Sequence, residues 1–134
     1  MGYPNVNILT FDPWAAFQPY ESGGSATGSV VVTAGTAVVM RAPAAGKGGA
    51  VTITEVFHAL PTGAGSLSLV NLGTSGTAVK GTVCTLGTAW TGAITEATPG
   101  DYVLEAGEYL GVVWNAGTIQ CKPGVVQVTY VIGK

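Results

Sequence analysis

The sequence predicts an all-β protein, a small jelly roll or β-sandwich of about eight antiparallel strands with an extended N-terminal arm. Short runs in which apolar and polar residues alternate recur along the chain, which is the pattern of half-buried strands. Turn signals separate these runs roughly every 8 to 12 residues, and Ala-Gly pairs begin at positions 34, 45, 64, 106 and 116. No segment shows the periodicity of an amphipathic helix.

Residues 1–27 differ in composition from the rest of the chain. They hold five of its eleven aromatic residues and three of its seven prolines, and they include the run Ser-Gly-Gly-Ser at 22–25. Prolines at this density exclude a continuous helix or a central strand, so we predict an extended arm with a flexible joint. The aromatic residues of this arm are the predicted partner-binding anchors: Tyr3, Phe11, Trp14, Phe17 and Tyr20.

If the arm packs only against its own domain, it is marginally stable, because ordering its residues costs more free energy than burying its aromatic rings releases. Backbone pairing with the edge of a neighbour's sheet, or docking in grooves on a partner, shifts that balance. We therefore expect a docking arm that becomes ordered on assembly, followed by a jelly-roll-like β domain over residues 28–134.

The first part of this domain is predicted to begin with a hairpin. Residues 30–33 and 36–41 are β-branched runs on either side of Ala34-Gly35, where glycine suits a tight turn. A loop over residues 43–49 leads to the strand 51–58. Its alternation becomes ambiguous in the second half, which indicates a β-bulge.

The middle of the domain is predicted to hold short, weak strands between Gly/Thr-rich turns. The predicted elements are a turn at 61–65, a strand at 66–70, weak strands around Val79 and Val83 within 73–92, and a short strand at 93–95 before Pro99-Gly100.

Residues 102–132 carry the clearest strand pattern and are predicted to form a meander of three strands. In the last strand the apolar positions 126, 128, 130 and 132 fall on one face, and in the middle strand positions 110, 112 and 114 do the same. Between the first two strands, Glu-Ala-Gly-Glu at 105–108 is predicted to be a hairpin tip, with both carboxylates in water. Such a meander needs a second layer to cover its apolar face.

The chain carries unusually little charge. Only 9% of its residues are charged, against about 25% in an ordinary soluble domain, although 47% are hydrophobic. We therefore expect other subunits to cover much of its surface. A net charge of −2 with scattered basic residues argues against nucleic-acid binding. The sequence also predicts neither a membrane span nor a secretory signal.

Few side chains suit catalysis or metal binding. His58 is the single histidine, so we expect a structural role for it. Glu105 and Glu108, with Asp101, are candidates for a carboxylate pair or a calcium site, but a hairpin tip favours solvation. The run Gly-Lys-Gly-Gly at 46–49 lacks the ending and the following helix of a phosphate loop. We predict no enzyme, no catalytic residue, no cofactor and no metal.

Two features leave alternatives open. Trp90 lies in a Gly/Thr-rich region and is a candidate sugar-binding aromatic, whereas Trp114 is in phase with predicted core residues. The chain has two cysteines, Cys84 and Cys121, which is far fewer than a disulfide scaffold has. We expect small buried hydrophobic residues at these positions, with a disulfide as the alternative.

The run Leu-Glu-Ala-Gly-Glu-Tyr-Leu at 104–110, the Gly/Thr/Val-rich domain of low charge and the aromatic arm together resemble the head decoration (cement) proteins of tailed bacteriophages, and more broadly trimeric virion jelly rolls. The resemblance implies a structural protein of the capsid exterior, assembled in the host cytoplasm. Such a protein forms a homotrimer and clamps adjacent subunits of the major capsid protein. Two alternatives remain: a carbohydrate- or receptor-binding module of a tail or head fibre, and a minor head-completion or tail structural protein.

Overall fold

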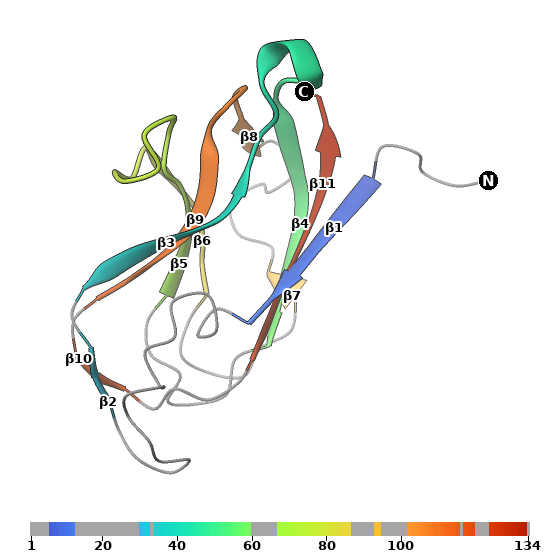
Figure 1. Ribbon diagram of the computed structural model, residues 1–134. Helices are drawn as coiled ribbons and strands as arrows, with labels where there is room; N and C mark the ends of the chain where they lie inside the picture. Colours follow the sequence, from blue (N-terminus) through green and yellow to red (C-terminus); the bar gives the residue numbers. More distant parts are fainter. Residues whose placement is uncertain are drawn as a thin grey trace.

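The computed structural model describes residues 6–12, 30–32, 34–59, 67–86, 93–94, 102–115, 117–119 and 124–133. Two larger antiparallel sheets pack face to face (Figure 1), and the predicted all-β sandwich is confirmed. The elements are β1 (Val6–Phe11), β2 (Val30–Val32), β3 (Gly35–Arg41), the 3-10 turn η2 (Ala45–Lys47), β4 (Val51–Ala59), β5 (Leu67–Asn71), β6 (Gly81–Thr85), β7 (Ala93–Ile94), β8 (Tyr102–Leu104), β9 (Tyr109–Trp114), β10 (Gly117–Ile119) and β11 (Val125–Ile132).

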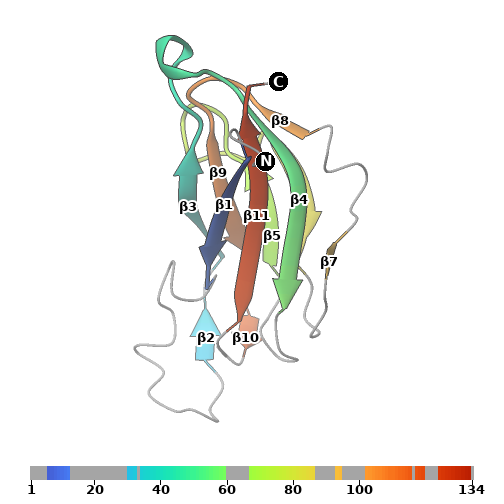
Figure 2. The ribbon, with the colours of Figure 1, turned by 90° about the vertical axis from the view of Figure 1, so that its right-hand side faces the viewer.

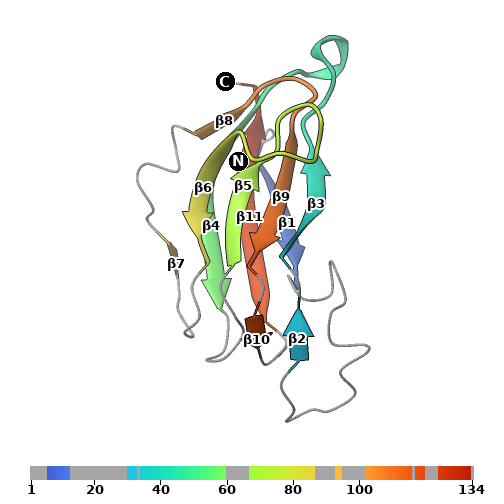
Figure 3. The same ribbon diagram turned by 90° about the vertical axis from the view of Figure 1, so that its left-hand side faces the viewer.

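The first sheet, called the β11 sheet, has the order β1-β11-β4. Both β8 and β7 pair with β4, β8 along its first half and β7 along its second half. The second, called the β9 sheet, has the order β3-β9-β5-β6. Figure 2 shows the β11 sheet in front, and Figure 3 shows the β9 sheet in front. β2 and β10 pair with each other beyond the end of the β3 and β9 ladder.

This strand order is that of a jelly roll. If β2 with β3, β7 with β8, and β9 with β10 are each taken as one interrupted strand, eight strands remain in the described part of the chain. Numbered along the chain, they have the orders 1-8-3-6 and 2-7-4-5. Consecutive strands therefore alternate between the sheets except at the β5 and β6 pair, as in a double Greek key.

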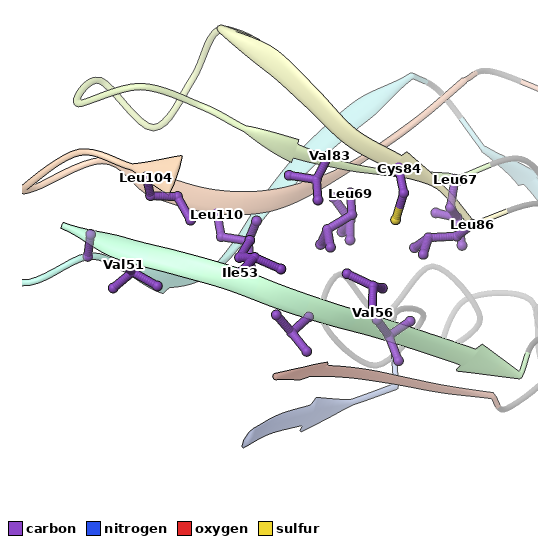
Figure 4. Close-up of a cluster of buried hydrophobic side chains, with 14 residues drawn as sticks. Val51, Ile53, Val56, Leu67, Leu69, Val83, Cys84, Leu86, Leu104 and Leu110 are labelled. Atoms are coloured by element: carbon purple, nitrogen blue, oxygen red, sulfur yellow. The ribbon is translucent and has the colours of Figure 1, made fainter. Parts of the chain in front are cut away.

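The hydrophobic core lies between the two sheets (Figure 4). Alternate residues of each strand point inward, and burial of each large aliphatic side chain contributes about 1.5–3 kcal/mol. The cluster consists of Ala42, Val51, Ile53, Val56, Leu67, Leu69, Val83, Cys84, Leu86, Leu104, Leu110, Val112, Val126 and Val128.

The predicted bulge lies in β4. Thr129 of β11 pairs with Glu55, and the next residue, Tyr130, pairs with Ile53, so Thr54 is the extra residue. The buried positions of β4 change phase at this point, from Ile53 to Val56. The ambiguous alternation of the sequence is the direct result of this inserted residue.

The predicted hairpin at Ala34-Gly35 is wrong. β2 and β3 follow one another in line, because Val32 pairs with Gly117 while Gly35 pairs with Trp114 on the same neighbouring segment. The glycine serves a packing contact instead of a turn. A Cβ atom at Gly35 would lie 2.3 Å from Cζ2 of the Trp114 indole.

The predicted hairpin tip at 105–108, and with it the meander, is also wrong. β8 pairs with β4 in the β11 sheet, whereas β9 lies between β3 and β5 in the β9 sheet. Residues 105–108 therefore connect the two sheets at one end of the sandwich. The positive φ expected of the glycine is present, since Gly107 has a φ of 80°.

Part of the predicted arm is a strand of the chain's own domain. β1 covers residues 6–11 and pairs along its whole length with β11, from Val6 opposite Val131 to Phe11 opposite Val126. Residues 1–5 and 13–29 lie outside the described residues.

Candidate functional site

One broad surface of the described structure is the outward side of β1, β11 and β4, here called the outer β11 face (Figure 2). Leu9 and Phe11 of β1 pack against the core, so the alternate residues of that strand point away from it. The exposed fractions of Val6 and Ile8 are 41% and 60%. The face consists of Val6, Ile8, Thr10, Thr52, Thr54, Glu55, Phe57, Gln127, Thr129 and Val131, with Glu55 as its one charged residue.

The outer β11 face is almost without charge. β1 and β11 contain no Asp, Glu, Lys or Arg, and β4 contains only Glu55, next to the bulge. β1 also ends the sheet on one side within the described part of the chain. Strands at sheet edges are usually protected by charged residues, prolines or bulges, because an edge offers backbone groups to another chain. Residues 6–11 contain no charged residue and no proline.

The size of this face sets a limit on what it can hold. Three strands about 4.8 Å apart, over six residues of about 3.3 Å each, give an area of roughly 300 Å². A stable interface buries about 800 Å² on each partner. The face alone is therefore less than half of such an interface, and other parts of the chain must supply the rest.

Among the predicted anchors, the structure places Phe11 on the inward side of β1, partly buried against the core. Tyr3, Trp14, Phe17 and Tyr20 lie outside the described residues, as does Trp90, the candidate sugar-binding aromatic. Sequence reasoning missed Val6 and Ile8. The alternation within residues 6–11 would have indicated them, but the prolines on either side directed the interpretation to an arm.

A second site, here called the Glu108 cluster, lies at the end of the sandwich where residues 105–108 connect the sheets. The expected solvation of Glu108 is wrong, because only 4% of this residue is exposed. Its Oε1 accepts hydrogen bonds from the Glu105 N–H at 2.7 Å and from Nδ2 of Asn71 at 3.1 Å. Its Oε2 forms an ion pair with Nζ of Lys80, and Tyr102 completes the cluster by sharing a hydrogen bond with Asn71.

The charges in this cluster depend on each other. Burial of the Glu108 carboxyl opposes its ionisation, but hydrogen bonds from Lys80, Asn71 and the Glu105 N–H outweigh that effect. The pKa of Glu108 therefore lies below its ordinary value. The same hydrogen bond raises the pKa of Lys80. The resting pair is an ammonium and a carboxylate.

Sequence reasoning did not single out Asn71 and Lys80. They stand nine positions apart at the two ends of the connection between β5 and β6, and no local pattern marks them as a pair. Their closeness to Glu108 depends on the arrangement of the two sheets, which a linear pattern does not contain.

The other residues singled out from the sequence lie in the core, in a loop or outside the described residues. His58 is buried, and burial lowers its pKa. Residues 43–49 form a loop with one 3-10 turn, and Trp114 packs partly buried against the core, both as predicted. Cys84 is buried in the core, whereas Cys121 and Asp101 lie outside the described residues.

Within the described ranges, no group of three or more His, Cys, Asp or Glu side chains is arranged to hold a metal ion. The same ranges contain no helix that is long and apolar enough to cross a bilayer. Comparison of the chain with protein-family models, with curated proteins and with solved structures gives no match.

Proposed function

We propose that this protein is a structural component of a tailed-phage virion, which decorates the capsid as a homotrimer and clamps adjacent subunits of the major capsid protein. The observation that carries the proposal is the outer β11 face, a nearly uncharged surface beside a strand edge without the usual protective residues. The resemblance of the sequence to cement proteins supplies the identity of the partner.

The N-terminal segment supports the same function. β1 lies at the edge of the outer β11 face, and residues 1–5 precede it and residues 13–29 follow it in the sequence. The aromatic residues Tyr3, Trp14, Phe17 and Tyr20 would add buried area there, which the face by itself lacks. Repetition of a modest contact at every trimer over a shell multiplies its effect on capsid stability.

The test uses capsids assembled without the protein and measures binding of the purified chain by cosedimentation. Ile8→Lys places a charge on the most exposed apolar residue of the face and is expected to weaken binding by at least about fivefold, since loss of an interface anchor costs more than about 1 kcal/mol. Trp14→Ala is expected to weaken binding in the same way.

The matched control is Val79→Lys. Val79 has a similar exposed fraction, 52%, but lies in the connection between β5 and β6. It should bind as the wild type does. Equal binding by the Ile8 and Val79 variants would refute the outer β11 face as the capsid contact, and a monomer in sedimentation at high concentration would refute the trimer.

A further inference from the structure

The Glu108 cluster brings together a nucleophile, a proton carrier and an electrophile. Nζ of Lys80 contacts one carboxylate oxygen of Glu108, and the side-chain amide of Asn71 contacts the other at 3.1 Å. One carboxylate therefore bridges an amine and an amide. Asn71 and Glu108 are both almost fully buried.

The backbone holds the two reacting residues together. The Lys80 N–H donates to the Asn71 carbonyl at 2.7 Å, and Asn71 is the register partner of Gly81. The amide carbonyl of the Asn71 side chain is polarised, because its Oδ1 accepts a hydrogen bond from the Gly73 N–H at 2.7 Å. This backbone donor is positioned to stabilise negative charge on that oxygen, as in an oxyanion hole.

We propose that Lys80 and Asn71 form an intramolecular isopeptide bond, with Glu108 as the catalytic residue that carries the protons. The reaction joins Nζ of Lys80 to Cγ of Asn71 and breaks the bond between Cγ and Nδ2. The ammonium and the primary amide become a secondary amide and an ammonium ion. No oxidant, reductant or co-reactant is needed.

The proton transfers use the contacts of Glu108 with Lys80 and Asn71, and in the attack Nζ moves from Oε2 of Glu108 onto Cγ of Asn71. Proton transfer from Nζ to Oε2 of Glu108 gives the neutral amine, which attacks Cγ while electrons move onto Oδ1 beside the Gly73 N–H. Oε1 lies next to Nδ2, so the carboxyl group can protonate the leaving nitrogen. The nitrogen of Nδ2 leaves as ammonia, and the second proton of Nζ passes through the Glu108 carboxylate to that ammonia. An ammonium ion is released, and Glu108 ends the reaction as the carboxylate it was at the start.

The ion pair implies a slow reaction. The amine is reactive only in the minor population in which the proton has moved to Glu108, so the bond should accumulate during incubation of the folded protein. The product fastens β6, the edge strand of the β9 sheet, to β5 at the end nearest the Glu108 cluster. A covalent tie at that position prevents the edge strand from separating there.

The test is the intact mass of the full chain after prolonged incubation under native conditions. The expected result is a mass lower than that of the sequence by one ammonia molecule. Trypsin should then fail to cleave after Lys80 and yield one peptide over residues 48–134, because Lys122 precedes Pro123 and is also resistant. The full sequence mass, with cleavage after Lys80, would overturn the proposal.

Two variants distinguish this bond from other losses of ammonia. Lys80→Arg keeps the positive charge but lacks the amine, and more than half of the Lys80 side chain is exposed, so folding should be retained. A succinimide at Asn71 would still form in this variant, and persistence of the mass loss there would refute the isopeptide. Glu108→Gln keeps the shape without the proton carrier and should retain the full mass while circular dichroism shows it folded.

Discussion

Gly111 offers a sharp test of the packing on the outer side of the β9 sheet. This residue lies within β9, between Val38 of β3 and Val70 of β5. A Cβ atom built there would lie 2.4 Å from Cδ1 of Leu72 and 2.5 Å from the carbonyl oxygen of Ala37. The first contact involves a fully buried side chain and the second involves backbone, so neither can give way cheaply.

Gly111→Ala should therefore destabilise the protein by about 3 kcal/mol, the upper part of the range for overpacking. The backbone of Gly111 is not at positive φ, so the cost is steric and not conformational. For a chain of 134 residues the unfolding entropy is about 0.28 kcal/mol/K, and the loss corresponds to a fall in Tm of roughly 10 °C. Thermal unfolding followed by circular dichroism measures this directly.

The matched control is Gly46→Ala in the loop after β3. Nothing lies within 4 Å of a Cβ atom at that position, and its φ is also not positive. This variant should unfold within a few degrees of the wild type, or slightly higher because the unfolded chain loses freedom. If the two alanine variants have the same Tm, the tight packing between β3, β9 and Leu72 is refuted.

Two further predictions concern the Glu108 cluster and the core. The folded-state pKa of Glu108 is lowered, so its contribution to stability is complete above the ordinary value of 4.5 and is lost as pH falls through the folded pKa. The Lys80→Arg variant retains an ion pair, and its free energy of unfolding in urea should fall as the pH is lowered. Adding Glu108→Gln should flatten this pH dependence. An unchanged pH dependence in the double variant would contradict the role of Glu108. Leu69→Ala should lower the free energy of unfolding by about 2–5 kcal/mol, because Leu69 is fully buried between the sheets. Val79→Ala, at an exposed position, should change it by less than about 0.5 kcal/mol, and similar losses for both would refute the assigned core.

Local patterns predicted most strands of the sandwich. The alternation in β4, β9 and β11 identified which residues face the core, and the interruption near Glu55 located a bulge. These features were readable because a strand that is buried on one side imposes a period of two on its own residues. The low charge of the chain was also evident from the sequence, and in the described structure it is seen on the outer β11 face.

The sequence did not show which strands pair with one another. Ala34-Gly35 and residues 105–108 both have the composition of hairpin turns, yet the first lies within an interrupted strand and the second passes between the sheets. A glycine with a small neighbour permits a turn, a close packing contact or a crossing connection equally well. Contacts with Trp114 and Arg41, both distant in sequence, decide the surroundings of Gly35 and Gly107.

The amino-acid order by itself determined that this protein is an all-β sandwich with little charge, because strand period and composition are properties of neighbouring residues. Only the tertiary structure decided that β1 lies at the edge of a nearly uncharged face and that Glu108 is buried between Lys80 and Asn71. Both results depend on which strands become neighbours across the two sheets. That choice is made by the packing of the whole core, and no short stretch of sequence records it.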